Sequence, residues 1–430
     1  MQKKLEEYFD RLWPICRSIT GQGFLDSLDI LKELIPLEKH GTKSGSMALD
    51  WTVPKVWNVN DAYVICPEGK KIIDFKANNL HLLNYSSPVK ATIDLIELQK
   101  HLYSLPELPD AIPYVTSYYK ERWGFCLTEK QRQSLKPGKY EVFIDSTLED
   151  GELYYGMSLL KSTVETNREI LISTYLCHPS MANNELSGPL VTAFLYKELE
   201  KLPTRNFNFR FVFVPETIGS LCFLKDYGDH LKKNCLGGFV ITCCGDEGPF
   251  TYKKSREEST FTNFHSIDFL NQYCTEKSKE LSVRNFFPTG SDERQYCSPG
   301  FNLAIGSITR SMYGEYEEYH TSLDNKDFIS FEAMKESVGV YKEIISKMNQ
   351  DTFYRNLKPH GEIMLGRRGL YPTLGAGRNV SQEIKAMNYL LNYSDGLHTI
   401  QMISDYSKIP VEELKPVARR LVEHNLLSEI

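Results

Sequence analysis

Apolar segments alternate with helix-like segments from about residue 150 to residue 350, and this alternation limits the possible folds most strongly. The strand-like segments EILISTYL, NFRFVFVP and GGFVITCC are apolar on both faces. Amphipathic segments such as GPLVTAFLYKELEKL and SLCFLKDYGDHLKKN lie between them. Strands with two apolar faces are typical of a parallel sheet that helices cover on both sides. The pattern therefore predicts an α/β fold, a three-layer sandwich with a central, largely parallel sheet.

Two regions nearer the N-terminus have a different sequence pattern. Residues 3–35 carry apolar side chains at helical spacing and predict two helices, separated by a break at residues 18–21. Residues 48–145 consist of short β-rich runs with Pro-Glu-Gly and Lys-Pro-Gly turn signals between them. We interpret residues 48–145 as an inserted, mostly β subdomain that covers the cleft. Residues 1–47 and 146–360 then form the α/β domain.

The C-terminal region has the pattern of a winged helix-turn-helix. The Gly- and Arg-rich residues 361–379 are interpreted as a linker, and three short helices are predicted within residues 379–430, in EIKAMNYLLNYS, TIQMISDYS and VEELKPVARRLVEHNLL. Residues 379–430 contain five Lys or Arg against seven Asp or Glu. A DNA-reading domain normally has a basic face. We therefore expect a packing or partner-binding role here and no nucleic-acid partner.

The composition excludes several classes of protein. The 430 residues are 41% hydrophobic and 25% charged, with a net charge of −6, which is typical of a soluble globular protein and not of a nucleic-acid binder. No apolar stretch has the length of about 20 residues that a membrane span requires. The N-terminal residues lack the apolar core of a signal peptide. The ten cysteines, with Cys243 and Cys244 adjacent, show no disulfide pattern, so a cytoplasmic location is expected.

Ionisable side chains follow the predicted strands at the points where those strands end. His178, Glu216 and Asp246 each come shortly after such a strand, Asp292 precedes the strand NLAIGSI, and His320 follows a strand-like stretch. In open α/β sheets, ligands bind outside the carboxyl ends of the strands. Each residue alone could be a capping, core or surface group. Together they predict a metal site at one edge of the sheet.

The residue types in this set suit a zinc hydrolase. His178 and His320 are the predicted nitrogen donors. The carboxylate ligand is either Glu185 or a residue from the loops that carry Asp246 and Asp292. Glu216, if it is not a ligand, could remove a proton from a zinc-bound water.

The order of these motifs resembles the zinc aminopeptidase superfamily, whose members hold co-catalytic zinc on an α/β sandwich. More closely, the chain is similar to the aminopeptidase-like proteins encoded among bacterial polysaccharide-biosynthesis genes, which end in a winged helix. The similar stretches lie between residues 11 and 325 and are RLWPICRSITG, DWTVPKVWN, CHPSMANNELSGP, PETIGSL, GSDERQYCSPG and YGEYEEYHTSLDN. The resemblance implies a fold of zinc-exopeptidase type. It also implies that His178 and His320 bind zinc and that Glu216 is the general base.

The sequence departs from the dinuclear pattern at three positions. Asn184 stands where the superfamily has a bridging aspartate. Thr217 stands where a second carboxylate follows the base. The superfamily's aspartate ligand at the strand end corresponds to a position near Cys243, and Asp246 is displaced from it by three residues. Two cations close together need bridging negative charge to offset their repulsion. We therefore expect one zinc ion, with two as the alternative.

The ligand set follows from this expectation. Glu185 is the chosen carboxylate ligand, with Asn184 as a weak or indirect ligand and Asp246 as a further candidate. Asp292 and Tyr319 join Glu216 as predicted catalytic residues. Other candidates for binding the substrate amine, the oxyanion or an anionic group are Glu293, Arg294, Tyr296, Arg256 and Arg310.

The leading hypothesis is a cytoplasmic, zinc-dependent hydrolase of aminopeptidase type. It would cleave a small peptide, an aminoacyl amide or an amide in an amino-acid-decorated sugar, and self-association is left open. The first alternative is a non-catalytic binding or scaffold protein that retains a degenerate hydrolase site and is associated with surface polysaccharide biosynthesis. The second is transcriptional regulation through the winged helix, which predicts salt-sensitive DNA binding.

Overall fold

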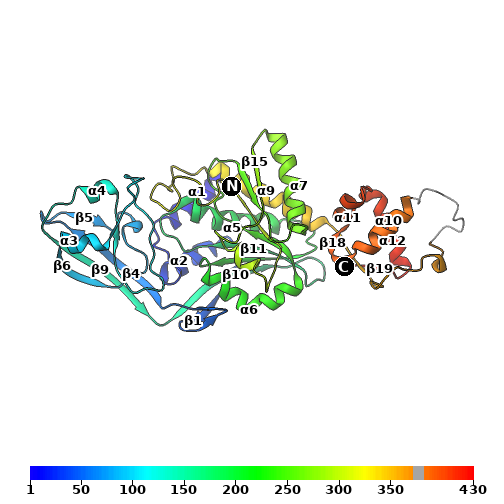
Figure 1. The fold of residues 1–430 in the computed structure, drawn as a ribbon, viewed down its shortest axis with the longest axis horizontal. Coiled ribbons are helices and arrows are strands. Elements are labelled where there is room, and N and C mark those ends of the chain that lie inside the picture. Colours follow the sequence, from blue (N-terminus) through cyan, green and yellow to red (C-terminus); the bar gives the residue numbers. More distant parts are fainter. Residues whose placement is uncertain (371–381) are drawn as a thin grey trace.

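A computed structural model describes residues 1–370 and 382–430, which form three parts along the long axis of the molecule (Figure 1). The inserted β-rich unit lies at one end, the α/β unit in the middle and the C-terminal helices at the other end. Residues 371–379 of the predicted linker lie outside the described residues.

The central sheet is mixed. Among the described residues it has eight strands in the order β1-β10-β12-β11-β13-β16-β14-β15. These are β1 (Glu38–Lys43), β10 (Glu152–Leu160), β11 (Glu169–Tyr175), β12 (Asn208–Val214), β13 (Cys235–Val240), β14 (Phe250–Lys253), β15 (Leu281–Arg284) and β16 (Ile305–Thr309). The neighbours β12, β11, β13 and β16 are parallel, whereas β10 and β14 pair antiparallel with this group. The predicted α/β sandwich is confirmed, and its parallel part is the centre of the sheet.

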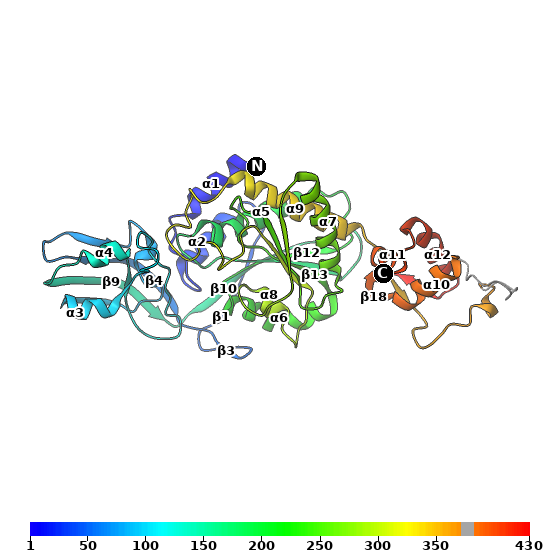
Figure 2. The ribbon, with the colours of Figure 1, turned by 45° about the horizontal axis from the view of Figure 1, so that its top comes forward.

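Helices cover both faces of this sheet (Figure 2). The helices α1 (Gln2–Leu12), α5 (Ser187–Glu200), α7 (Phe261–Lys277) and α9 (Phe331–Gln350) pack together on one face, and α2 (Gln22–Leu31) joins α1 and β10. The helices α6 (Ile218–Asn234) and α8 (Glu293–Tyr296) contact one another, and α6 packs on the other face. Along β11, Ile170 and Ile172 belong to the core under α5, whereas Leu171 belongs to the core under α6. This alternation explains why the strand is apolar on both faces.

Helix α5 begins unusually close to the sheet. A Cβ atom on Gly188 would lie 2.4 Å from the carbonyl oxygen of Ile241, just beyond β13. Only glycine allows this approach without a shift of the backbone. The close contact fixes the turn that leads into α5, and that turn carries the residues Asn183, Asn184 and Glu185.

The inserted unit is built on a sheet in the order β5-β4-β9-β6. Its elements are β4 (Val56–Ile65), β5 (Lys71–Asp74), β6 (Val89–Asp94) and β9 (Lys139–Glu149), the short pairs β2 (Met47–Ala48) with β3 (Trp51–Thr52) and β7 (Leu102–Tyr103) with β8 (Phe125–Cys126), and the helices α3 (Leu95–Leu98) and α4 (Glu129–Gln133). Trp57 and Tyr85 of this unit share one apolar core with Tyr175 and Ile218 of the α/β unit. The insert is therefore packed against the α/β unit through a continuous core.

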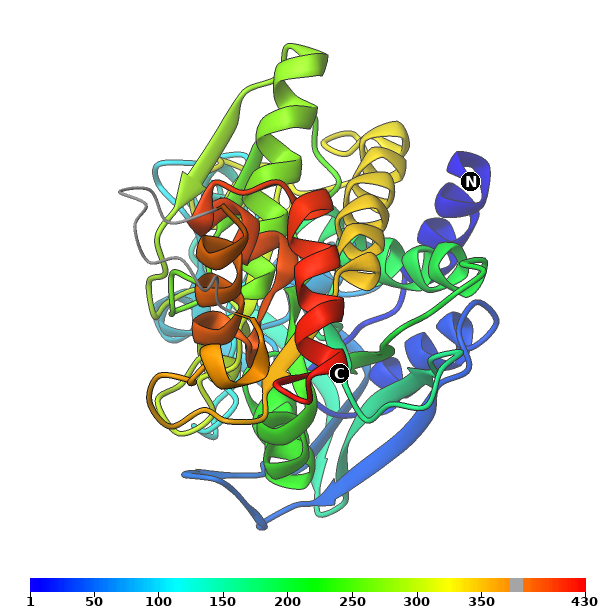
Figure 3. The ribbon, with the colours of Figure 1, turned by 90° about the vertical axis from the view of Figure 1, so that its right-hand side faces the viewer.

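The C-terminal unit is a winged helix-turn-helix, as the sequence predicts (Figure 3). The helices α10 (Gln382–Tyr393), α11 (Ile400–Ser407) and α12 (Val411–Glu423) enclose their own apolar core beside the sheet β18-β17-β19. Helix α12 ends at Glu423, before the predicted end at residue 427. The reason is that Asn425 adopts a left-handed conformation (φ 51°) and turns the chain into β19 (Leu427–Glu429).

One strand within the predicted α/β domain belongs to the sheet of the C-terminal unit. The predicted domain extends to residue 360 and so includes β17 (Phe353–Asn356). However, β17 pairs with β18 (Asp395–Thr399) and β19 of the C-terminal unit. The other domain limits stay a prediction. No helix within residues 1–370 and 382–430 combines the length and the apolar character that crossing a membrane would require.

Candidate functional site

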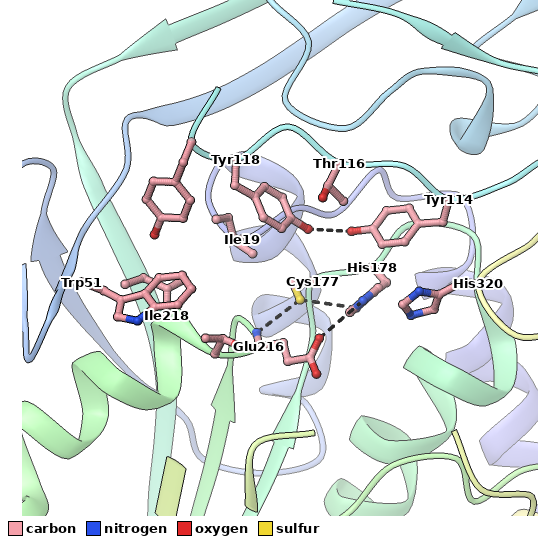
Figure 4. A pocket seen from close by; sticks show the side chains of 12 residues that line it. Ile19, Trp51, Tyr114, Thr116, Tyr118, Cys177, His178, Glu216, Ile218 and His320 are labelled. Carbon is pink, nitrogen blue, oxygen red and sulfur yellow. Dashed lines mark hydrogen bonds and ion pairs between the residues drawn. The ribbon is translucent and has the colours of Figure 1, made fainter. Parts of the chain in front are cut away.

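The carboxyl ends of two parallel strands bring His178 and Glu216 together (Figure 4). His178 follows β11 and Glu216 follows β12, and these neighbouring strands end at the same edge of the sheet. The Nε2 atom of His178 lies 3.7 Å from a carboxylate oxygen of Glu216. The site thus forms where the strand-end rule for α/β sheets places it.

His320 completes a pair of imidazoles, of which His178 is buried and His320 is partly buried. The ring centroids of His178 and His320 are 5.2 Å apart, and the ring of Tyr114 packs against both at 4.9 and 5.4 Å. The Nε2 atom of His320 is buried and has no hydrogen-bond partner among the described residues. Burial lowers the pKa of each histidine to about 3, so both rings are neutral at pH 7. Neutral imidazole is the form that binds a metal ion.

Glu216 faces the same space on a strained turn. Its side chain is 24% exposed, and its backbone N–H donates to the sulfur of Cys177 at 3.3 Å. The next residue, Thr217, has a φ of 63° and a ψ of −76°, which is rare for a non-glycine residue. Burial raises the pKa of Glu216 well above its usual range, and the nearby Asp292 adds to this rise. A carboxyl group with a raised pKa in a cavity has the character of a general acid–base group.

Glu185 lies on the opposite side of the His178 ring from the cavity. Its carboxylate is 2.9 Å from Nδ1 of His178, and it is fully buried. The guanidinium of Arg17, also fully buried, lies 3.9 Å from Glu185 and donates to the carbonyl oxygens of Leu12 and His178 at 2.6 and 3.2 Å. Burial raises the pKa of Glu185 to about 8, with Arg17 acting in the opposite direction. This contact holds His178 so that Nε2 points at Glu216.

Asn184 sits in a π-helical turn (Ala182–Leu186) that a buried carboxylate holds in place. The Asp324 carboxylate accepts hydrogen bonds from the backbone N–H groups of residues 182–184, at 3.2, 2.6 and 2.9 Å. The amide nitrogen of Asn184 donates to the hydroxyl of Tyr175 at 3.0 Å, and its Oδ1 atom is buried without a partner among the described residues. The predicted role of Asn184 as a weak ligand stays a prediction.

Asp246 is engaged away from the histidine pair. Its carboxylate accepts hydrogen bonds from the side-chain amide of Asn183, from the backbone N–H of Gly248 and from both the N–H and hydroxyl of Ser311. These contacts tie the loop after β13 to the loop after β16. The structure therefore does not bring Asp246 to the predicted metal site.

Asp292 and Tyr319 contact the residues that carry the site without lining the cavity. Asp292 accepts from the Thr217 N–H at 2.8 Å and from the Ser220 hydroxyl at 2.9 Å, so it holds the turn that carries Glu216. Burial raises the pKa of Asp292 to about 6, although these hydrogen bonds oppose the rise. The ring of Tyr319 stacks on His320, with centroids 3.9 Å apart. Neither residue lines the cavity, so these contacts suit a positioning role, and the catalytic roles predicted for them remain untested.

Three of the other predicted binding groups are engaged elsewhere. Glu293 lies 2.5 Å from the ammonium of Lys253, the hydroxyl of Tyr296 lies 2.8 Å from that of Ser173, and Arg310 pairs with Glu336. These contacts occupy the side chains of Glu293, Tyr296 and Arg310.

The cavity at the site has a volume of about 280 Å³ and two unlike walls. One wall carries Cys177, His178, Glu216, Thr217 and His320 of the α/β unit. The other carries Trp51, Tyr114, Thr116, Tyr118 and Tyr119 of the insert, and Ile19 and Ile218 complete the lining. Burial raises the pKa of Tyr114 and Tyr118 well above the usual range. Tyr114 and Tyr118 lie in none of the sequence motifs quoted above, so the sequence did not indicate them.

A different metal position can be drawn from the same residues. Ligand atoms of Cys177, His178 and Glu185 all lie within 4.8 Å of one another. A metal ion binds thiolate, but burial raises the pKa of the Cys177 thiol well above its usual range. In addition, Nδ1 of His178 already contacts Glu185. The Nε2 atom of His178 lies on the side of Glu216.

Solved structures with the same architecture define the class of the fold. The chain matches a peptidase M28 precursor from Shewanella amazonensis (12% identity, TM-score 0.57) over 81% of its length and 92% of that chain. It matches a zinc aminopeptidase from Bacillus subtilis (11% identity, TM-score 0.57) over 80% of its length and 93% of that chain. At such identities the likeness shows the fold alone. The α/β unit therefore has the aminopeptidase fold.

The chain belongs to the family described as domain of unknown function DUF4910, which matches residues 6–351, and residues 352–429 match a winged helix-turn-helix family. A Clostridium acetobutylicum protein is 44% identical over 97% of this chain and 94% of its own length. It is provisionally named a polysaccharide biosynthesis protein with an aminopeptidase-like domain. A crystal structure from the same organism, provisionally described as a peptidase, matches all of this chain and 96% of that one (41% identity, TM-score 0.80). The resemblance stated from the sequence motifs is thus confirmed.

Proposed function

We propose that this protein is a metal-dependent hydrolase of aminopeptidase type that cleaves a small peptide or an aminoacyl amide. The observation that carries the proposal is the pair of neutral imidazoles, with ring centroids 5.2 Å apart, beside a carboxylate 3.7 Å from Nε2 of His178. The cavity beside them has a volume of about 280 Å³, which suits a small substrate. The name of the Clostridium relative links that protein to polysaccharide biosynthesis, so we include amides of amino sugars among the candidate substrates.

The residues present offer one zinc ion two nitrogen ligands, and the Glu216 carboxylate lies beside them, 3.7 Å from Nε2 of His178. His178 and His320 would hold it through their cavity-facing nitrogens, since Nε2 of His320 is buried without a partner among the described residues and Nδ1 of His178 is taken by Glu185. A second ion does not fit, because Asn184, Thr217 and Cys243 replace the carboxylates it would need. We propose that Glu185 orients His178 instead of serving as the ligand that the sequence suggested.

The chain's own residues would divide the remaining work. Bound zinc polarises a carbonyl and makes water more acidic. Glu216 would accept the proton of the attacking water and transfer it to the nitrogen of the leaving amine, while a C–O bond forms and the C–N bond breaks. Glu185 and Tyr319 would hold the two rings, and Asp292 would hold the turn of Glu216. The aromatic wall of the insert would limit the size of the substrate and exclude water.

The proposal is tested by metal analysis and turnover on the full chain. The protein is stripped with EDTA, supplemented with zinc, dialysed and analysed, and then screened with aminoacyl p-nitroanilides and aminoacyl amides of amino sugars. We expect about one equivalent of zinc, and turnover that chelation removes and zinc restores. Less than about half an equivalent of zinc, or turnover that survives chelation, would overturn the proposal.

The absence of acidic residues at positions 184 and 217 favours a second candidate, a binding protein that does not hydrolyse its ligand. In that case the purified protein would bind an aminoacyl amide without releasing amine over hours. For the C-terminal unit we propose a packing or partner-binding role, because its predicted helices carry a net negative charge. A gel shift at low salt would contradict that role.

A further inference from the structure

The inserted unit places two tyrosine hydroxyls against the cavity, opposite the residues of the sheet edge. The hydroxyl oxygens of Tyr114 and Tyr118 lie 2.6 Å apart, and both residues line the cavity. Figure 4 shows the two hydroxyls pointing toward one another along one side, with Cys177, His178 and Glu216 on the other side. An amide in the cavity would therefore lie between the hydroxyls and the carboxylate.

The number of protons on this pair leaves one donor free. Each hydroxyl has one proton, and a hydrogen bond between the two uses only one of them. In the described part of the chain, neither hydroxyl has another hydrogen-bond partner. Whichever tyrosine donates to the other, the second proton remains available to a group in the cavity.

Tyr114 is fixed relative to the histidines by backbone contacts. Its N–H donates to the carbonyl oxygen of His320 at 2.8 Å, and Pro113 forms a β-bridge with Thr321. Its ring also packs on both histidine rings. These contacts tie this part of the insert to the loop that carries His320.

Tyr118 is fixed by the core of the insert. Its ring packs edge-on against Tyr85 at 5.3 Å, and Tyr85 in turn stacks on Trp57 at 5.7 Å. The hydroxyl of Tyr85 donates to the carbonyl oxygen of Lys55 at 2.8 Å. A donor that is held rigidly does not need to reorganise when charge develops beside it.

We propose that the Tyr114–Tyr118 hydroxyl pair is a catalytic hydrogen-bond donor, supplied by the insert, that binds the carbonyl oxygen of the substrate amide and the negative charge which that oxygen gains during attack. No proton leaves the pair, since both O–H bonds stay intact while the hydrogen bond strengthens. This inference rests on the proposed hydrolase function. It also gives the insert a chemical task in addition to covering the cleft.

The test compares Tyr114→Phe, Tyr118→Phe and the double variant with a matched control, Tyr63→Phe. Tyr63 lies on β4 of the same unit, packs on Phe143 and does not line the cavity. Steady-state kinetics use the aminoacyl p-nitroanilide that the wild type cleaves fastest. We expect the double variant to lose about 10²–10³-fold in kcat, with little change in KM and an unchanged zinc content. Each single variant should lose less, because the remaining hydroxyl still has a proton to donate.

The outcomes separate this inference from the proposed function. If the wild type turns over and the double variant has a kcat within about twofold of it, the tyrosine pair is not a catalytic donor. A wild type without turnover would count against the proposed function. The tyrosine pair is then tested by measuring the binding of leucine phosphonic acid, a tetrahedral anionic probe. We expect at least about tenfold weaker binding of this probe to the double variant than to Tyr63→Phe. Equal affinity, including no binding by either, would overturn the inference.

Discussion

Replacing Glu216 with glutamine is expected to lower kcat by about 10³-fold while the protein keeps its zinc. Glutamine has the shape of glutamate but cannot accept a proton from water. The glutamate side chain faces the cavity and lies 3.7 Å from Nε2 of His178, so it is placed to serve the reacting water. The measurement pairs kcat on the best p-nitroanilide substrate with zinc content determined on the same preparation.

A matched control separates a catalytic effect from a change of local charge. Glu317 is exposed and lies on the loop that precedes His320, and Glu317→Gln should leave both kcat and zinc content unchanged. Loss of zinc from Glu216→Gln would show that Glu216 is a ligand and not the base. A kcat within about tenfold of the wild type would remove Glu216 from the mechanism altogether.

Replacing Arg17 with methionine is expected to lower the free energy of unfolding by about 3–5 kcal/mol. The Arg17 side chain is fully buried and donates to the carbonyl oxygens of Leu12 and His178. Methionine fills part of the volume but removes the Arg17 donor from both carbonyl oxygens and leaves Glu185 without its nearby cation. Among the described residues, the Leu12 carbonyl keeps only the N–H of Ile15, at 3.2 Å. Buried polar groups that lose their partners are among the most costly changes in a protein interior.

Urea denaturation of Arg17→Met and Arg11→Met measures this difference. Arg11 also pairs with a carboxylate, that of Glu33, but the two side chains are 38% and 49% exposed. An exposed ion pair is worth less than about 1 kcal/mol, so Arg11→Met should change stability little. If Arg17→Met does not fold, Arg17→Lys keeps the charge and should show a smaller but measurable loss. Equal stability of the Arg17 and Arg11 variants would contradict the role assigned to Arg17.

The positions of the strand-end residues could be predicted because they follow from connectivity. Parallel neighbouring strands end at one edge, so His178 and Glu216 had to lie near one another once β11 and β12 were recognised. The same rule failed for Asp246, although it follows β13. The Asp246 carboxylate instead accepts hydrogen bonds from the Asn183 side chain and the Ser311 hydroxyl.

The side of the imidazole that each carboxylate occupies could not be predicted. Glu185 comes only seven residues after His178 and was expected to share its cation, but the π-helical turn places it at Nδ1. The hydrogen bonds that hold this turn come from Asp324, about 140 residues further along the chain. No local pattern could have shown that contact.

By itself, the sequence determined the alternation of strands and helices, the order of the three parts and the residue types at the sheet edge. These follow from local periodicity and from short motifs, which a single chain displays directly. Only the tertiary structure decided that Glu185 stands behind His178, that Asp292 supports the turn of Glu216 and that the insert faces the site with Tyr114 and Tyr118. Such contacts depend on the direction in which side chains leave distant turns, and packing between units sets that direction.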